Sequence, residues 1–574
     1  MPTVAETIVT ALAELGVKTI WGVVGDALNP VTDAIRREQR LEWIGVRHEE
    51  VGAFAAGAQA QLSGTLGVCM GTVGPGSLHL LNGLYDARKS HAPVLAICGQ
   101  VPLAELGSDF FQEVDNDAVF HDVATFCRTI TSPEQLPGIL EQAVQLALGT
   151  PGVAVLTLPG DVAGLDAPGA VPHFVTERRP VVPDPAALRD AAQRLDDAGA
   201  VTLLVGAGAR HARAEVLALA DRLAAPMVLT LKAKESLETD NPFAVGQSGL
   251  IGNPAAQHAL QHCDTLLMLG TDFPYSAWYP KGKTVIQVDQ RSAHIGRRTS
   301  VVLGVVSDTR LAVAGLLASV APKSDRGHLE DSTGRYGKWR TEQLQLADPD
   351  YDSRGIVEKV RSAFDNPDER IRPEAVAVAV DRHAAPDAIF TSDTGMSTVW
   401  LSRFVVMSGS RRLLGSYNLG SMANAMPQAL GAQALDRSRE VVAFCGDGGL
   451  TMLLGDLLTA VSHDLRVRLV VFNNGRLGMV KLEQEQGGLP EFGTVLGNVD
   501  LAAIARAAGL HAVRVEKPDD LDEAVRSVFS VPGPALLDIV TNPEEISLPP
   551  KVKPAQAWGF AIAKLTETLE SRSS

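Results

Sequence analysis

Short apolar runs and segments of helical periodicity alternate along this chain as far as about residue 542. Each apolar run has the length of a strand that is buried on both faces, and the segments between the runs are long enough for crossover helices. This alternation predicts α/β domains with doubly wound parallel sheets. For the first domain, residues 1–180, we expect strands at 19–24, 66–70, 94–98 and 153–158.

Breaks in this pattern divide the rest of the chain. A proline-rich stretch from Pro168 to Pro185 predicts an extended linker. A second α/β domain is expected over residues 181–345, and a third over residues 355–545. A polar stretch at 323–355 has no strand pattern and is expected to lie on the surface. The strands expected in these two domains are 201–205, 265–270 and 284–289, then 388–391, 441–445, 469–472 and 535–540.

The last segment, residues 546–574, has apolar residues at helical spacing. One face of a short helix would carry Trp558, Ile562, Leu565 and Leu569. Such a face either docks on the protein's own surface or contacts a membrane, and the pattern does not decide between them.

Composition and charge exclude several classes of protein. At 574 residues the chain is long enough for three or four domains. A net charge of −16 argues against nucleic-acid binding, which needs clustered basic residues. The five cysteines are scattered, which favours reduced core thiols in a cytoplasmic protein. No secretory signal and no apolar run long enough to span a membrane is recognised.

The strongest chemical motif is Gly446-Asp447-Gly448, followed further on by Asn473-Asn474. Each half comes directly after an apolar run. Because the carboxyl ends of parallel strands lie at one edge of a sheet, the Asp447 carboxylate and the Asn474 amide oxygen are expected to lie together there. Two hard oxygen ligands beside glycines suit a Mg²⁺ ion that carries a diphosphate. The alternative is that both halves are ordinary turns.

This motif resembles the cofactor motif of the thiamin diphosphate (ThDP) enzymes, and residues 47–58 resemble the segment that carries their glutamate. The resemblance covers about residues 3–562 and is greatest to the FAD-containing branch. Within that branch the chain is most similar to the pyruvate:quinone oxidoreductases, also called quinone-dependent pyruvate dehydrogenases or pyruvate oxidases. The most specific stretches are 20–29, 47–62, 107–113, 249–252, 270–275, 411–433 and 441–456.

The resemblance implies a complete ThDP site. Asp447, Asn474 and the carbonyl of Arg476 would bind Mg²⁺. Glycines would let backbone amides reach the diphosphate, helped by helix N-termini after Gly449 and Gly395. Met422 would bend the cofactor; its alternative is ordinary core packing. The other residues implied to contact ThDP are Thr72, Gly420, Ser421, Gly448, Gly475, Leu477, Gly478, Met479 and Val480.

Glu49 is implied to hydrogen-bond the aminopyrimidine ring and so to control proton transfer within the cofactor. The alternative is that Arg47-His48-Glu49-Glu50 is a solvated helix start. The small residues that follow, such as Ala55, Ala56 and Gly57, favour a closely packed helix instead. In the family the two halves of a site come from two subunits, which implies a homodimer or a homotetramer.

Several residues are implied to lie near the substrate. Phe111 and Gln112 match a family loop, although an aromatic loop also suits the core. Glu483 matches an acidic residue on the helix after Asn474, where the alternative is a solvated face. Met479 stands where relatives carry an aromatic residue that moves, so that gating role is in doubt. His79 and His91 are polar candidates for which a structural role is favoured.

The middle domain is implied to bind FAD, although none of its segments would identify a flavin by its chemistry alone. Gly206 and Gly208 after a strand give only a weak nucleotide signal. The residues implied to contact FAD are Gly206, Gly208, Gly249, Leu250, Ile251, Gly252, Asp272, Phe273, Pro274, Tyr275, Ser276, Asp289, Gln290 and Asp308.

The resemblance implies oxidative decarboxylation of pyruvate to acetate and CO₂ through a thiamin-bound hydroxyethyl intermediate. Electrons would pass through FAD to a membrane quinone, ubiquinone or menaquinone. The alternatives are an oxygen-dependent pyruvate oxidase, an acetohydroxyacid synthase-type carboligase with a structural FAD, and a flavin-binding scaffold without activity. We expect a cytoplasmic enzyme with at most a peripheral contact at the inner face of the cell membrane.

Overall fold

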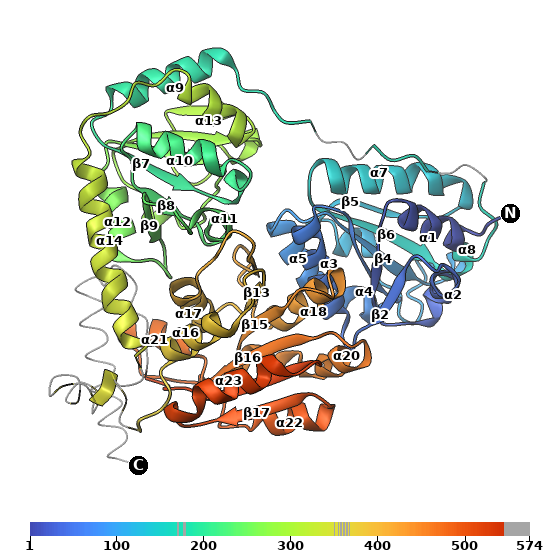
Figure 1. Ribbon diagram of the computed structural model, residues 1–574. Coiled ribbons are helices and arrows are strands. Elements are labelled where there is room, and N and C mark those ends of the chain that lie inside the picture. The colour runs from blue at the N-terminus through green and yellow to red at the C-terminus, as the bar shows by residue number, and fades with distance from the viewer. Residues whose placement is uncertain are drawn as a thin grey trace.

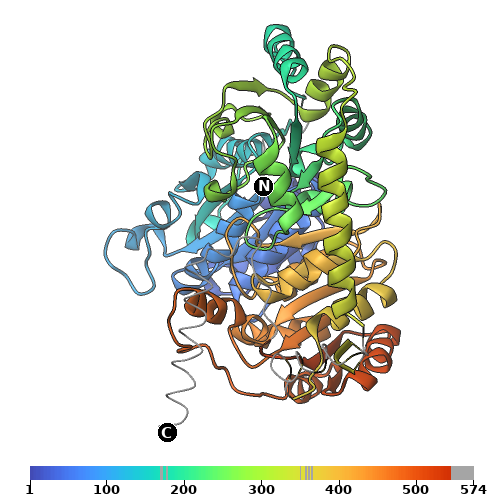
Figure 2. The ribbon, with the colours of Figure 1, turned by 90° about the vertical axis from the view of Figure 1, so that its left-hand side faces the viewer.

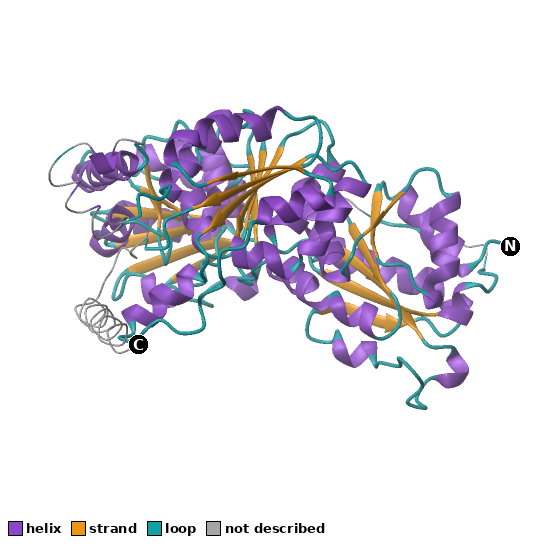
Figure 3. Ribbon diagram, turned by 90° about the horizontal axis from the view of Figure 1, so that it is seen from below, coloured by secondary structure: helices purple, strands orange, loops and turns teal. Residues whose placement is uncertain are grey.

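The computed structural model of the chain describes residues 1–544, apart from 169–171, 176–178 and several positions within 349–367. It contains three six-stranded sheets (Figure 1). Every registered pair of neighbouring strands runs parallel. Helices flank the sheets when the molecule is seen from below (Figure 3). The predicted α/β fold class is therefore confirmed.

The first and third sheets have the same strand order. The first sheet runs β2-β1-β3-β4-β6-β5, and the third runs β14-β13-β15-β16-β18-β17. Numbered within its own domain, each sheet has the order 2-1-3-4-6-5, so these two domains share one topology that the sequence did not show. The strands are β1 (Thr19–Gly22), β2 (Glu42–Gly45), β3 (Gly67–Gly71), β4 (Val94–Gln100), β5 (Ala124–Thr129), β6 (Val153–Pro159), β13 (Ile389–Ser392), β14 (Arg412–Gly415), β15 (Val441–Gly446), β16 (Val467–Asn473), β17 (His511–Val515) and β18 (Ala535–Val540).

Helices complete these two domains. Those of the first domain are α1 (Val4–Glu14), α2 (Asn29–Arg37), α3 (Glu49–Ser63), α4 (Pro75–His79), α5 (Leu81–Lys89), α6 (Asn116–Val119), α7 (Leu136–Gly149) and α8 (Gly160–Ala163). Those of the third domain are α16 (Pro373–His383), α17 (Met396–Phe404), α18 (Ala425–Leu435), α19 (Asp447–Met452), α20 (Leu457–Ser462), α21 (Gly478–Gln486), α22 (Leu501–Ala508) and α23 (Leu521–Ser530).

The middle sheet has the order β12-β11-β10-β7-β8-β9, which is the order of dinucleotide-binding domains. In such sheets a ligand binds at the switch point, here between β7 and β10. The strands are β7 (Val201–Val205), β8 (Met227–Leu229), β9 (Ala244–Gln247), β10 (Thr265–Leu269), β11 (Thr284–Asp289) and β12 (Leu303–Val306). The helices are α9 (Pro185–Asp197), α10 (Arg213–Arg222), α11 (Lys234–Leu237), α12 (Pro254–His262), α13 (Thr309–Leu317) and α14 (Gly327–Leu346).

Each apolar run named above as a strand is a strand here, with ends shifted by a few residues. The polar stretch at 323–355 contains α14, a long helix that runs from the middle domain toward the third (Figures 1 and 2). In the second half of α14, the Trp339 ring centroid lies 5.7 Å from the Arg403 guanidinium of α17. The described part of the stretch, 323–348, therefore does lie mostly on the surface, but as a connecting helix.

The proline-rich stretch joins the first domain to the middle one (Figure 1). Its described residues between 172 and 184 form neither helix nor strand, as is compatible with the predicted extended linker. The expected apolar helix within 546–574 lies outside the described residues. Among the described residues, no helix is both long enough and apolar enough to cross a membrane. All five cysteines are buried and free, as predicted.

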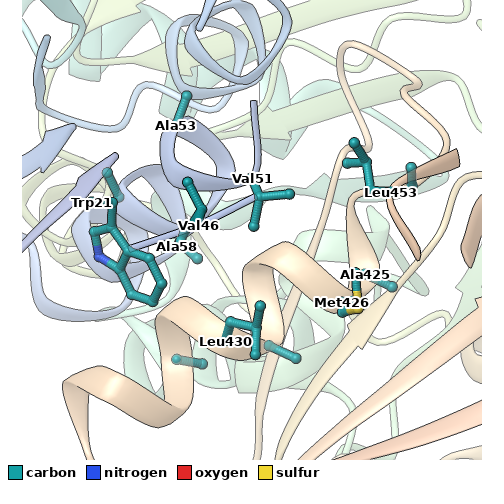
Figure 4. Close-up of a cluster of buried hydrophobic side chains, with 14 of the residues drawn as sticks. Trp21, Val46, Val51, Ala53, Ala58, Ala425, Met426, Leu430 and Leu453 are labelled. Atoms are coloured by element: carbon teal, nitrogen blue, oxygen red, sulfur yellow. The ribbon is translucent and has the colours of Figure 1, made fainter. Parts of the chain in front are cut away.

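The first and third domains share one hydrophobic core, in which α3 packs against α18 (Figure 4). Residues 51–60 of α3 are all buried, so the prediction of a closely packed small-residue helix is confirmed. The two helices approach to backbone contact, because a Cβ placed on Gly431 would stand 2.4 Å from the Ala55 carbonyl oxygen. This pair holds the amino end of α3 close to the carboxyl edge of the third sheet.

Candidate active site

Asp447 and Asn474 follow β15 and β16, which are neighbouring parallel strands. The buried Asp447 carboxylate accepts a hydrogen bond of 2.7 Å from the Gly475 amide, and this bond ties the two loops together. Burial raises the pKa of Asp447 to about 6. A nearby cation would offset that cost by favouring the ionised form. The two residues therefore follow neighbouring strands at one edge of the sheet, and their side-chain oxygens are of the type that Mg²⁺ binds. Metal binding there stays a prediction.

The loop after β16 is held by a second loop. The Leu477 amide donates to the Thr494 carbonyl at 2.8 Å, and the Leu496 amide donates to the Gly475 carbonyl at 2.8 Å. The Arg476 side chain forms an ion pair with Glu491. Gly475, with φ +65°, adopts the left-handed conformation that this tight path requires. A cleft of about 350 Å³ opens beside Asn474, Gly475 and Arg476. Gly478 and Val480 stand in the first turn of α21.

Met422 lies against the Gly448 turn, because a Cβ on Gly448 would stand 3.4 Å from Met422 Cε. Gly420 adopts φ +82°, and Ala423 adopts φ +61°, which is unusual for alanine and marks backbone strain at this segment. One expectation is corrected. The helix expected after Gly449 begins at Asp447, because Gly446 still belongs to β15. Gly395, with φ +145°, does precede α17 as expected.

Asp393 is a buried residue of this site that the sequence analysis missed. It follows β13, accepts hydrogen bonds from the Ala425 amide at 2.9 Å and the Gly446 amide at 3.2 Å, and so joins three loops. Burial raises its pKa to about 7. A Cβ on Gly449 would stand 2.3 Å from its Oδ2, so this glycine is required by packing. The signal was available, since an acid directly after an apolar strand was the argument used for Asp447.

Glu49 is the first residue of α3, and its side chain is almost fully buried. The alternative of a solvated helix start is therefore wrong for Glu49. His48 caps the helix by accepting from the Glu50 amide, and His79 Nδ1 lies 2.9 Å from Glu49 Oε2. The His48 and His79 rings stack with centroids 4.3 Å apart. His79 thus contacts Glu49 directly, although a structural role was favoured for it.

The loop that begins at Thr72 lies against Glu49. A Cβ on Gly76 would stand 3.1 Å from Glu49 Oε1, and one on Gly74 would stand 3.0 Å from Gln112 Cβ. Gln112 therefore comes close to this group, in the left-handed conformation at φ +66°. The Thr72 hydroxyl is buried and has no hydrogen-bond partner among the described residues. Such an orphaned group beside a buried carboxylate fits a polar heterocycle such as the thiamin aminopyrimidine.

Phe111 and His91 lie in different surroundings, one exposed to solvent and the other in contact with the middle domain. Phe111 is 78% exposed, so the alternative of a core position is wrong. His91 contacts the middle domain instead of the Glu49 group that His79 joins, with its ring centroid 5.3 Å from that of His294. Burial, with Arg291 and His294 as further causes, lowers the pKa of His91 to about 3. A neutral imidazole at a domain contact agrees with the structural role favoured for His91.

The two halves of the predicted site meet within this one chain. The Asn82 amide of α5 donates to Glu50 Oε1 at 2.7 Å and to Ser421 Oγ at 3.0 Å. Ser421 precedes Met422, which contacts Gly448. One side chain therefore links the amino end of α3 to the segment expected to hold the cofactor. Sharing of the site between two subunits stays a prediction.

Two residues expected near the substrate, Met479 and Glu483, lie on α21. Met479 packs against the core of the third domain, as does Ile251 of the middle domain. Glu483 is exposed, in agreement with the solvated alternative. Its negative charge nevertheless contributes, after burial, to raising the pKa of the Tyr275 phenol. The segment expected to bind FAD and the segment expected to bind substrate therefore lie close together.

The segment before Gly249 has unsatisfied polar groups. The Gln247 Nε2 and Ser248 hydroxyl groups are buried without a hydrogen-bond partner among the described residues. Gly249 adopts φ +94°, and a Cβ there would stand 3.1 Å from both Phe273 and Tyr275. Leu250 is 41% exposed, and Gly252 ends the turn with a 3.0 Å bond to the Gly249 carbonyl. Unpaired polar groups beside aromatic rings fit a flavin nucleotide.

Other residues expected to contact FAD already have partners. Asp272 pairs with Arg297 at 2.9 Å and Arg298 at 3.0 Å. Asp289 lies 3.6 Å from His294 Nδ1. Asp308 caps α13 by accepting from the amides of Arg310 and Leu311. Gly206 and Gly208 pack on Gly270 at the switch point. The positions of Pro274, Ser276 and Gln290 neither support nor oppose a flavin site. Flavin contact stays a prediction for all of these residues.

Comparison with known families matches three parts of the chain, each within one of the three domains. Residues 2–119 match the N-terminal TPP binding domain of thiamine pyrophosphate enzymes. Residues 188–316 match the central domain, and residues 393–539 match the C-terminal TPP binding domain. Thiamine pyrophosphate is another name for ThDP. Asp447 and Asn474 fall in the C-terminal match and Glu49 in the N-terminal match.

Individual relatives are similar over nearly the whole chain. The Bacillus subtilis protein YdaP, provisionally named as containing thiamine pyrophosphate, is 35% identical over 99% of this chain and 97% of its own. The pyruvate oxidase of Lactiplantibacillus plantarum is 30% identical over 93% of this chain and 87% of its own. The large subunit of acetolactate synthase isozyme 1 of Escherichia coli is 30% identical over 96% of each chain.

Proposed function

The chain belongs to the thiamine pyrophosphate enzyme family, and on this premise we propose that it oxidatively decarboxylates pyruvate to acetate and CO₂, with FAD as the electron carrier and a membrane quinone as the acceptor. When bound, ThDP would supply an electron sink for the carbon–carbon bond that breaks, and FAD would accept two electrons. The protein's own part is to position the substrate and the cofactors, to exclude water from the site and to control proton transfer.

Glu49 has the position and burial that proton control requires. Its carboxyl group lies at the amino end of α3, and His79 holds Oε2 at 2.9 Å. Gly76 leaves the space next to Oε1 open to a ring nitrogen. A carboxyl held there can share a proton with a heterocycle and exchange it without large movement. Met422 fills the space above the Gly448 turn, which would set the shape of a bound cofactor.

The observation that carries the redox part of the proposal is the proximity of Tyr275 to Glu483. Tyr275 borders the orphaned polar groups of Gln247 and Ser248, and Glu483 belongs to the helix after Asn474. A flavin and a substrate bound at these two places would lie close enough for electron transfer.

Two other reactions remain as candidates because of named relatives. The pyruvate oxidase of L. plantarum favours an oxidase that uses oxygen, and the acetolactate synthase of E. coli favours carboligation. Quinone use would also require contact with the inner face of the cell membrane by an otherwise cytoplasmic enzyme. The segment expected to make that contact, 546–574, lies outside the described residues.

The test is an anaerobic one. Purified protein with ThDP and Mg²⁺ is mixed with pyruvate while the flavin absorption band is followed. Rapid bleaching, reversed faster by a quinone analogue than by oxygen, with acetate as the product, is the expected result. Faster reversal by oxygen would support the oxidase instead. A flavin that stays oxidised while acetolactate forms would support the carboligase, and absence of bound flavin would overturn the assignment of the middle domain.

A further inference from the structure

Three potential metal ligands gather at the amino end of α3. They are His48, which caps the helix, Glu49, which begins it, and His79, which ends α4. One ligand atom from each residue lies within 4.8 Å of the other two, and among the described residues this is the one such group of three. Its members come from two segments that the fold brings together, so the group is a product of tertiary structure.

The composition of this group selects a particular class of ion. Two imidazoles and one carboxylate form the ligand set of zinc sites that keep a position open. Mg²⁺ prefers six oxygen ligands and would gain little here, whereas Asp447 and Asn474 offer it oxygen. The two metal-binding sites of the protein would therefore differ in the ion they accept.

The buried carboxylate of Glu49 favours a bound cation, and the partly exposed rings of His48 and His79 make the group accessible to an ion from solvent. The Glu49 side chain is 8% exposed, which disfavours an uncompensated negative charge. The side chain of His79 is 45% exposed and that of His48 is 37% exposed, so an ion can reach them from solvent. The His79–Glu49 hydrogen bond of 2.9 Å already holds two of the ligands together. Little ordering is left for an ion to impose.

We propose that His48, Glu49 and His79 bind a Zn²⁺-type ion when the enzyme is free of its organic cofactor, and that this ion prevents the cofactor ring from reaching Glu49. The competition rests on the proposed function, but the binding of the ion does not. Because linkage is reciprocal, the ion weakens cofactor binding by the same factor by which the cofactor weakens ion binding. Transition-metal ions would thus inhibit the enzyme, and an excess of ThDP would relieve that inhibition.

The test uses Co²⁺ as a coloured substitute for Zn²⁺, added to the full-length protein free of ThDP. One equivalent is expected to give the intense visible bands of a four-coordinate site, and Zn²⁺ should abolish them. His79→Gln should remove the bands. His48→Asn should remove them too, while asparagine keeps the helix cap. The control is His262→Gln, because His258 and His262 form another stacked histidine pair, with ring centroids 3.9 Å apart.

The outcomes separate the proposal from its premise. Retained bands in His79→Gln and His48→Asn, or loss of the bands in His262→Gln, would overturn the site. If the site exists, Zn²⁺ at about ten times its dissociation constant should raise the apparent dissociation constant of Mg²⁺–ThDP about tenfold. Bands that persist under saturating Mg²⁺–ThDP would refute the competition. Failure of pyruvate turnover would affect neither reading, because both measurements report binding.

Discussion

The side-chain amide of Gln428 in α18 donates a hydrogen bond of 3.0 Å to Asp86 Oδ2 in α5, and both residues are buried. The bond joins the third domain to the first. Burial raises the pKa of Asp86, and the charge of Lys232 in the middle domain acts in the opposite direction. All three domains therefore act on one carboxyl group, which makes it a sensitive reporter of their association.

Gln428→Ala is expected to lower the free energy of unfolding by about 1–3 kcal/mol, because it removes a hydrogen-bond donor from a buried carboxylate. Chemical denaturation of the cofactor-free protein measures this. Asp86→Asn and the double variant complete a cycle. If the two single effects simply add, the two side chains do not stabilise each other and the domain contact rests on the apolar core alone.

Glu49→Gln should retain cofactor binding and lose activity. We expect turnover to fall about 10²- to 10⁴-fold, the usual contribution of a positioned acid or base. The neighbouring Glu50→Gln is the matched control, since glutamine keeps the oxygen that accepts from Asn82. Steady-state turnover and titration with Mg²⁺–ThDP give the two quantities. Equal losses in both variants would show that the effect comes from the helix end in general.

Co-expression of Glu49→Gln with Asp447→Asn tests whether a site is shared between subunits. Each variant alone is expected to be inactive. With shared sites, a mixed dimer holds one doubly altered site and one intact site, so random pairing should restore roughly a quarter of wild-type activity. The Asn82–Ser421 contact within one chain permits the other arrangement, in which no activity returns. Dimerisation itself is checked by sedimentation.

Asp393 predicts a pH dependence of stability. Its pKa is about 7 in the folded protein because of burial, against an ordinary value of 3.8. The folded state therefore holds this proton more tightly than the unfolded state does. The resulting stability is complete below about pH 4 and is lost as the pH rises to about 7, by an amount on the order of 4 kcal/mol.

Unfolding of wild type and Asp393→Asn at several pH values between 5 and 8 measures this effect. The variant cannot ionise at this position, so the stability of wild type relative to the variant should decrease as the pH rises. Asp519→Asn, which alters an exposed acid in the same domain, should follow wild type. A difference that does not change with pH would mean that Asp393 is already ionised at pH 5.

The sequence predicted the central strands and the metal-ligand edge because both follow from local pattern. Val441–Gly446 is apolar and ends in Asp447, and parallel pairing then determines which side chains meet. It did not predict the edge strand Glu42–Gly45, whose residues range from exposed to buried without an apolar run. Nor did it predict α14, in which only Leu329 and Ser332 are buried, because such a helix has little apolar face.

The side-chain relationships of the site depend on tertiary contacts and were beyond local pattern. Nothing in residues 47–58 indicates that His79 lies against Glu49, since α3 and α4 are brought together by β3, the strand that separates them in the sequence. Asp393 and Asp447 each come directly after an apolar strand, yet only Asp447 belongs to a recognisable motif. Motifs report residues that resemble known ones, whereas burial and pKa identify residues that the fold itself makes unusual.

Gly431 gives the contact between α3 and α18 a property that side-chain packing would not. Ordinary helix pairs are separated by side chains, which change rotamer and let the helices shift with temperature or with a point substitution. Here the two backbones are in direct van der Waals contact, so no change of side-chain rotamer can alter the spacing at this point. The span between Glu49 and the metal-ligand edge is thus a fixed length, and a cofactor must match that length. A single methyl group added at Gly431 would clash with the Ala55 backbone and force the two helices apart, which would move Glu49 away from the metal-ligand edge.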